Sequence, residues 1–258
     1  MTDVFEEVEE EIHSERLKRL ARNWLPILGG ILLVALIAAL AWWGWQSYQT
    51  SRAHSGSIAY QRGLEALQTG NSAGAETAFA EAEKTGNGAY KALALQQRAG
   101  IAVAANRIPD AIALFDDAAK ASGDPILHDT AVYKSALLMM DNGATLETLE
   151  DRLEPLTKEG RPLVPFAQEA LGMARLQFNK PAEAREVFVL LTLGQDVPDS
   201  VRQRAQAAIA MIDSGVAAGL PAIVAAQAVM PPAAPAGPPQ GAPQVQTAPA
   251  QPAPAAQQ

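Results

Sequence analysis

The chain has 258 residues, with 20 lysines and arginines against 28 aspartates and glutamates, and no cysteine. Without cysteine it has no disulfide, no thiolate zinc site and no cysteine nucleophile. Its net charge of −8 at pH 7 argues against a nucleic-acid partner, because such binding requires clustered basic groups that displace counterions from phosphates.

Residues 1–23 begin acidic and end basic. Asp3 and five glutamates precede residue 12, and four basic residues follow between Arg16 and Arg22. Basic residues beside an apolar segment remain in the cytoplasm during insertion, and only Arg52 lies close to the segment on its other side. The charges therefore predict a cytoplasmic N-terminal segment, with everything after residue 46 across a membrane.

Residues 24–45 form an uncharged apolar run of 22 residues. As a helix this run is roughly 30 Å long, which matches the hydrocarbon core of a bilayer. Both of its ends carry tryptophan, whose ring favours the headgroup level: Trp24, Trp42, Trp43 and Trp45. We expect a transmembrane helix that is retained as an anchor.

Two other interpretations of this run stay open. A cleaved signal peptide would use Ala39-Leu40-Ala41 as its cleavage site, but it would leave Trp42 near the new terminus and would have an acidic leader. A buried core helix would be unusually long and unbroken for a chain of this size.

A linker is expected over residues 46–56 and a helical domain over residues 57–213. Three segments of this domain share one spacing, in which a small residue is followed twelve positions later by Ala and sixteen positions later by Phe. The small residue lets two helices approach closely, and the Phe fills the gap between that pair and the next. The three sets are Gly63, Ala75 and Phe79; Ala99, Ala111 and Phe115; and Gly172, Ala184 and Phe188.

This spacing resembles the tetratricopeptide repeat, a helix-turn-helix unit of about 34 residues. The sequence therefore predicts an all-α protein, in which one N-terminal transmembrane helix precedes a tetratricopeptide-repeat-like right-handed helical superhelix. An ordinary helical bundle is the alternative.

One further, degenerate unit is expected over residues 126–158, between the second and third sets. Its Phe position falls at Asp151 or Arg152, and its second helix would bury a stripe of leucines instead: Leu146, Leu149 and Leu153. A last helix, with Asp199 or Ser200 as its N-cap, would close the array with a polar outer face.

The stacked first helices of such units form a concave groove that suits extended or helical polypeptide. The repeat register places six residues along the expected groove: Tyr60, Leu64, Gln96, Val103, Tyr133 and Met173. The alternative is that these side chains cover a neighbouring helix.

The end of the chain divides into two parts. Residues 214–230 are an apolar linker, too short for a membrane span, which would dock onto the domain or bind a partner. Residues 231–258 consist almost wholly of Pro, Ala, Gln and Gly. This composition cannot bury a core and predicts a disordered tail.

Residues that could carry catalysis are scattered. His13, His54 and His128 lie in separate segments without partners at metal-ligand or triad spacing, and no glycine-rich phosphate loop is present in the sequence. Acidic pairs such as Asp116 and Asp117 are expected on exposed helix faces. The sequence therefore predicts no enzyme, no cofactor, no metal and no small-molecule substrate.

The whole layout resembles the ancillary Sec-translocon subunit family (YfgM-like). The resemblance rests on the N-terminal segment EEVEEEIHSERLKRLARNW, the anchor end WWGWQSYQ and the domain start SIAYQRGLEAL, and it covers roughly residues 5–213. It implies a single-pass protein of the bacterial inner membrane with a periplasmic repeat domain. Its implied partners are the SecYEG translocon, periplasmic chaperones and emerging chains.

Two other functions stay open, because a repeat groove indicates only that something is bound. One is a structural adaptor for cell-envelope or cell-division machinery. The other is an accessory subunit of another inner-membrane complex, such as a respiratory one.

Overall fold

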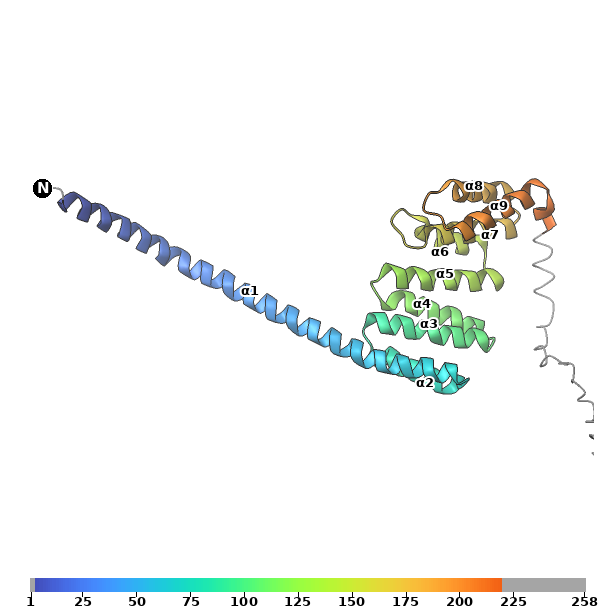
Figure 1. Cartoon of the computed structure of the whole chain (residues 1–258), viewed down its shortest axis with the longest axis horizontal. Coiled ribbons are helices and arrows are strands. Elements are labelled where there is room, and N and C mark those ends of the chain that lie inside the picture. The colour runs from blue at the N-terminus through green and yellow to red at the C-terminus, as the bar shows by residue number, and fades with distance from the viewer. Residues whose placement is uncertain (1–2, 220–258) are drawn as a thin grey trace, which may run out of the picture.

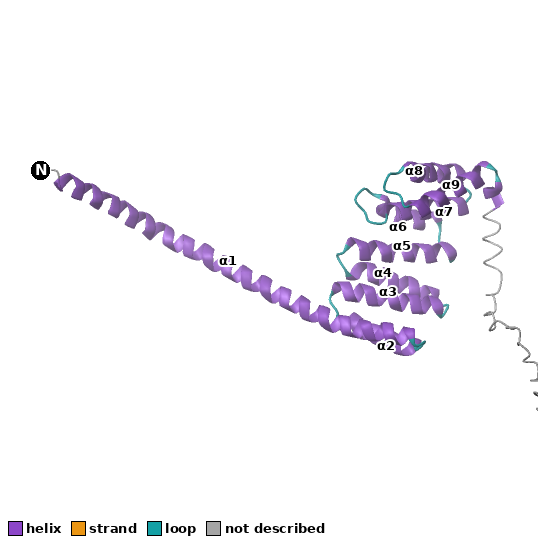
Figure 2. Ribbon diagram, in the orientation of Figure 1, coloured by secondary structure: helices purple, strands orange, loops and turns teal. Residues whose placement is uncertain are grey.

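The computed structural model describes the backbone of residues 3–219 and the side chains of residues 29–219. All regular elements of this range are helical, which confirms the predicted all-α fold (Figures 1 and 2). The tail over residues 231–258, the apolar residues 220–230 and the side chain of Trp24 lie outside the described residues. The elements are α1 (Asp3–Gln68), α2 (Ser72–Thr85), α3 (Gly88–Ala104), α4 (Ile108–Ala121), α5 (Pro125–Asp141), α6 (Leu146–Leu153), the short 3-10 helix η1 (Glu154–Thr157), α7 (Val164–Gln177), α8 (Pro181–Leu193), α9 (Asp199–Asp213) and η2 (Val216–Gly219).

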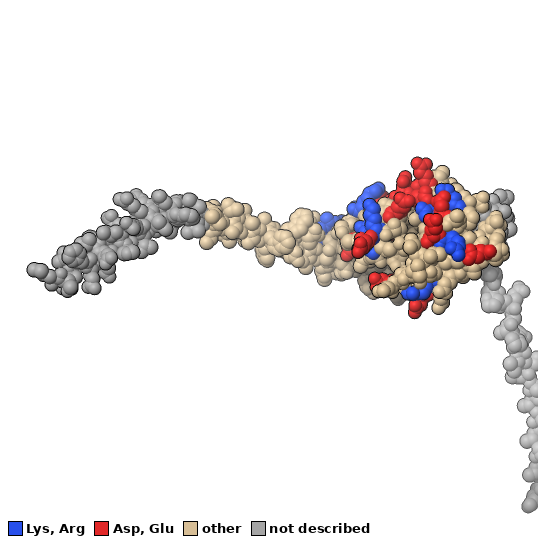
Figure 3. Space-filling view, turned by 90° about the horizontal axis from the view of Figure 1, so that it is seen from above, with Lys and Arg blue, Asp and Glu red and all other residues tan. Residues whose placement is uncertain are grey.

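Helix α1 projects from the stack of shorter helices as a long rod (Figure 1). Among the described residues it is the one helix whose length and composition suit a membrane span or a signal sequence, from Gly29 onward. Its large apolar side chains between Ile31 and Trp45 are exposed: Leu32 is 71% exposed and Trp42 is 73% exposed. Figure 3 shows this part of the rod without charged side chains, whereas Lys, Arg, Asp and Glu gather on the repeat domain.

The same helix continues into the domain without a break. Residues 46–56, expected as a linker, are helical and belong to α1. The Arg52 guanidinium donates hydrogen bonds to the carbonyl oxygens of Lys84 (2.7 Å) and Thr85 (3.2 Å), which end α2. Gly56 lies so close to Gly86 that a Cβ on it would approach the Gly86 Cα to 2.5 Å. The apolar rod and the first repeat are therefore parts of one helix.

The helices pack in sequential pairs around residues of the shared spacing. A Cβ placed on Gly63 would lie 2.5 Å from Cε1 of Phe79, and one placed on Gly172 would lie 2.7 Å from Cζ of Phe188. Both rings are almost fully buried. At these two positions each aromatic ring thus packs directly onto the backbone of the preceding helix, in the space that a Cβ would otherwise take.

The turns that join the two helices of each unit recur at a regular position. A residue in the left-handed conformation ends the first helix of every unit, with φ between 56° and 78°; these residues are Gly70, Asn106, Gly143 and Asn179. Glycine and asparagine tolerate this conformation best, so they stop the helix and reverse the chain.

The third unit is degenerate because its turn is longer. Its second helix begins three residues after Gly143, whereas the corresponding helices begin two residues after the left-handed residue in the other units. The buried face therefore moves by one residue. Leu153 takes the Phe position, rather than Asp151 or Arg152, and it is buried together with Leu149 and Leu156.

The close contact at Gly63 yields a stability prediction. Gly63→Ala places a methyl group inside the Phe79 ring, so it should lower the free energy of unfolding by about 1–3 kcal/mol. A matched control is Gly100→Ala in α3, where an added Cβ meets nothing within 4 Å. This control should gain up to about 1 kcal/mol from helix propensity. Thermal melts of the full chain in mild detergent measure both, and equal effects would show that the helix pair is packed differently.

Candidate interaction groove

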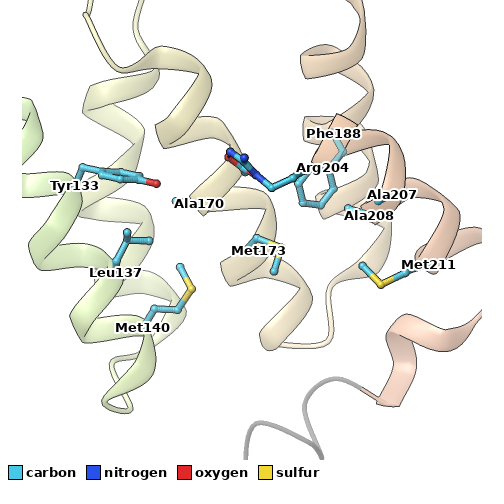
Figure 4. Close-up of a pocket in the computed structure, with 11 residues that line it drawn as sticks. Tyr133, Leu137, Met140, Ala170, Met173, Phe188, Arg204, Ala207, Ala208 and Met211 are labelled. Atoms are coloured by element: carbon cyan, nitrogen blue, oxygen red, sulfur yellow. The ribbon is translucent and has the colours of Figure 1, made fainter. Parts of the chain in front are cut away.

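An open cavity of about 490 Å³ lies between α5, α7 and α9 (Figure 4). Helices α5 and α7 are the first helices of the third and fourth units, and α9 follows the fourth unit. Its lining is mostly apolar and consists of Tyr133, Leu137, Met140, Glu169, Ala170, Met173, Phe188, Arg204, Ala207, Ala208 and Met211. We call this cavity the α5–α7–α9 groove.

Helical spacing explains why these side chains share one face. In α5, Tyr133, Leu137 and Met140 are four and then three positions apart, so one face of the helix carries all three. Alanines of α7 and α9 keep the groove open, because they do not fill the space beside their longer neighbours. The floor is the Phe188 ring from α8, the same ring that packs on Gly172.

One ion pair forms the polar edge of the groove. Arg204 of α9 binds both carboxylate oxygens of Glu169 of α7, with 2.7 Å between Nη2 and Oε2. Burial of the Tyr133 hydroxyl, and after it the negative charge of Glu169, raise the pKa of this phenol above its ordinary value. The groove therefore offers a neutral hydroxyl group and a mutually neutralised pair beside an apolar floor.

Methionine is prominent in the lining. Met140, Met173 and Met211 come from three different helices, and Met173 and Met211 are 43% and 37% exposed. Methionine side chains are flexible and polarisable, so they adapt to differently shaped apolar partners. Such a lining can adapt to apolar groups of different shapes.

The six residues expected along the groove fall into two groups. Tyr133 and Met173 line the α5–α7–α9 groove. Tyr60 instead packs on Phe79, with 5.4 Å between ring centroids, and its hydroxyl accepts a hydrogen bond from Gln97. Gln96 donates to the Leu127 carbonyl oxygen.

The two remaining expected residues also lie away from the groove. Leu64 packs against the hydrophobic cluster of the first repeat, which includes Ala75 and Phe79. Val103 is exposed on α3 without lining this cavity. For Tyr60, Leu64 and Gln96 the structure therefore places the side chains against neighbouring helices.

Sequence reasoning missed the contribution of α9. That helix was expected as a cap with a polar outer face, yet Arg204, Ala207 and Met211 form one wall of the groove. The signal available in the sequence was the spacing of Arg204, Ala208 and Met211 on one helix face. The sequence did not show that this face lies opposite α7, because that depends on how the helices stack in the superhelix.

Asp116 is not the exposed surface carboxylate that the sequence predicted. It accepts hydrogen bonds from Arg152 of α6, at 2.8 Å between Oδ2 and Nη2, and from the buried Ser135 hydroxyl of α5 at 2.8 Å. Burial alone would raise its pKa, but the hydrogen bonds from Arg152 and Ser135, together with the charge of Arg152, outweigh burial and lower the pKa. Both carboxylate oxygens are occupied, so the group joins helices and is not free for acid-base chemistry.

His128 has a partner that its sequence position did not reveal. Its Nδ1 lies 2.9 Å from Oδ1 of Asp129, a fully buried carboxylate that also pairs with Arg161. This cluster ties the segment between η1 and α7 to α5. His54 is exposed, and the side chain of His13 lies outside the described residues.

Comparison with known proteins gives one match. A family profile described as a tetratricopeptide repeat-like domain matches residues 18–190, which is more than half of the chain. No curated protein and no solved structure matches the chain. The matched range ends before α9 begins, so one wall of the groove lies beyond it.

The Asp116 network predicts a specific loss of stability in acid. Because the folded pKa of Asp116 is below the unfolded value of about 3.9, its contribution is fully present above that value and is lost as pH falls through the folded pKa. Asp116→Asn should cost about 1–2 kcal/mol at pH 7 and less as the pH approaches 3. Urea denaturation at several pH values measures this difference.

Asp117→Asn is the matched control for this prediction. The Asp117 side chain is 62% exposed and pairs only with Lys120, one turn away. Its substitution should change the free energy of unfolding by under about 0.5 kcal/mol at every pH. Indistinguishable effects of the two substitutions would contradict a helix-joining role for Asp116.

Proposed function

Because the chain belongs to the tetratricopeptide repeat-like domain family, whose fold is an interaction scaffold, we propose that this protein is a non-enzymatic binding scaffold held in the bacterial inner membrane by α1. Its repeat domain lies on the periplasmic side and binds polypeptide. The family match supports the scaffold function, while the anchor, the orientation and the partners are argued from the residues below.

The exposed apolar part of α1 supports the anchor. Side chains from Ile31 to Trp45 are exposed along a whole stretch of helix, and large apolar surfaces of this kind are unfavourable in water. A bilayer removes that cost because its core is as apolar as leucine. The basic residues between Arg16 and Arg22 favour the cytoplasm for the N-terminus.

The continuity of α1 is the single observation that carries the proposal. Trp45, whose ring suits the headgroup level, precedes Arg52 by seven residues, or about 10 Å of helix. Arg52 already contacts the end of α2. The first repeat therefore begins close to the membrane surface, and the rigid helix holds the whole stack near it.

The composition of the α5–α7–α9 groove supports a polypeptide as ligand. An apolar, methionine-rich lining with a neutral hydroxyl group and a paired Arg204–Glu169 edge accommodates an apolar segment with few charges. Unfolded or emerging secretory chains expose such segments. With the resemblance to the ancillary Sec-translocon subunits, this favours SecYEG, periplasmic chaperones and emerging chains as partners.

The topology is tested by a reporter fused after Gln258. The reporter should be active only outside the cytoplasm, and alkaline carbonate should leave the protein in the membrane fraction, because the apolar helix is retained in the bilayer. A shortened soluble species that begins near Trp42 would instead show that the helix is a cleaved signal peptide.

Binding at the groove is tested with photocrosslinking side chains in place of Met173 and Tyr133 in living cells. Both positions should give several-fold more adducts with secreted chains, chaperones or translocon subunits than a control at Asp117, an exposed position on α4. The reason is that Met173 and Tyr133 line the cavity, whereas Asp117 does not. Adducts confined to division or respiratory proteins would contradict the association with secretion.

A further inference from the structure

The chain leaves the repeat domain directly beside the α5–α7–α9 groove. Helix α9 ends in a left-handed turn at Gly215, with φ of 75°, whose amide donates to the Ile212 carbonyl oxygen at 3.0 Å. This turn reverses the chain into η2. There Ala217 is buried in the same hydrophobic cluster as Phe188 and Ala208, two residues of the groove.

The next eleven residues have the composition that the groove accommodates. Residues 220–230 read LPAIVAAQAVM, without a single charge and with aliphatic side chains such as Ile223 and Val224. The charged residues of the groove, Glu169 and Arg204, already neutralise each other. An occupant therefore needs no charge of its own, and an uncharged apolar segment loses no ionic hydration on entering.

The other parts of the chain outside the described side chains do not suit the groove. Residues 1–23 are rich in charge, and residues 231–258 consist almost wholly of Pro, Ala, Gln and Gly, so neither offers a run of aliphatic side chains. Residues 24–28 are apolar, but they belong to the proposed membrane span at the other end of the chain. Residues 220–230 are thus the segment whose chemistry and starting point both match the cavity.

The length of the segment is sufficient to reach the groove. Fully extended, eleven residues span roughly 36 Å, and as a helix about 16 Å. The groove wall from Arg204 to Met211 is about 10 Å long, and adjacent helix axes lie about 8–10 Å apart. A tether this short gives an effective concentration on the order of millimolar, so even a weak contact is populated.

We propose that residues 220–230 occupy the α5–α7–α9 groove of their own chain, covering Met173 and Met211, and that a polypeptide partner must displace them. The occupancy follows from the exit point and from composition. The displacement rests on the proposed function of the groove as a polypeptide-binding site.

Engineered disulfides test the occupancy directly, because the natural chain has no cysteine to interfere. The double variant Met173→Cys with Val224→Cys, in the full chain in mild detergent, should form an intrachain disulfide several-fold faster than two controls. One control pairs Val224→Cys with Asp117→Cys on α4. The other pairs Met173→Cys with Val245→Cys in the proline-rich tail.

Gel mobility and mass spectrometry separate the outcomes of this experiment. An intrachain disulfide in the test pair alone supports the proposal. A disulfide between two chains would assign the groove to a second copy and overturn it. Equal rates in all three variants would overturn it as well, since the segment would then favour no site.

The displacement is tested with a fluorescent synthetic peptide of residues 220–230. A chain truncated after Gly219 should bind this peptide at least ten-fold more tightly than the full chain, because its groove has no occupant. The full chain with Val224→Asp should bind the peptide almost as tightly as the truncated protein does. The full chain with Val245→Asp should bind it as weakly as the natural chain does. Equal binding by the truncated and full chains would overturn the proposal.

The two proposals fail in distinguishable ways. An intrachain disulfide without any cellular adducts at Met173 in the truncated chain would remove the polypeptide-binding function and leave the occupancy standing. Adducts with secretory proteins at equal yield in the truncated and full chains would remove the occupancy and leave the function standing.

Discussion

The contact between a small residue on one helix and an aromatic ring on the next determines the rest of this structure. At Gly63 and Gly172 the ring of a phenylalanine lies where a side chain would otherwise be. This contact sets how closely two helices approach, and its repetition stacks the pairs in one direction. The α5–α7–α9 groove is a consequence, because successive first helices share one face and Phe188 forms the floor between them.

Helix α1 joins the apolar rod to the repeat array without a break. Its last turns are the first helix of the first repeat, and Arg52 closes the end of α2 by binding its terminal carbonyl oxygens. A flexible linker would let the domain sample a wide volume. A continuous helix instead fixes the direction of the groove relative to the apolar rod. If the rod is the membrane anchor that we propose, a partner near the membrane surface meets the groove in one orientation.

The sequence predicted the elements that depend on local spacing and failed where contacts join distant segments. The helical fold and the Phe79, Phe115 and Phe188 pattern follow from periodicity alone. The burial of Leu149 and Leu153 was also expected, but the place of Leu153 at the Phe position was not, because it depends on one additional residue in the turn after Gly143. Asp116 was expected on an exposed face. Local spacing could not reveal its partner, Arg152, because the two residues are 36 positions apart in the sequence.

The groove illustrates the same limit. Tyr133 and Met173 line the α5–α7–α9 groove, whereas Tyr60 and Gln96 have similar helical positions but pack against neighbours. Which first helices leave a cavity between them depends on the sizes of side chains from three helices at once. The alanines of α9 create that space, and no local pattern in the sequence distinguishes them from the other alanines of the domain.

The rigid connection between anchor and repeat domain is the central claim, and a distance measurement tests it most directly. Spin labels at Gln46→Cys on α1 and Asp117→Cys on α4, in lipid nanodiscs, report the separation of the apolar helix from the repeat stack by electron paramagnetic resonance. One narrow distance distribution is expected, broadened when four glycines are inserted after Gln49. A broad distribution in the natural sequence, unchanged by the insertion, would contradict the account.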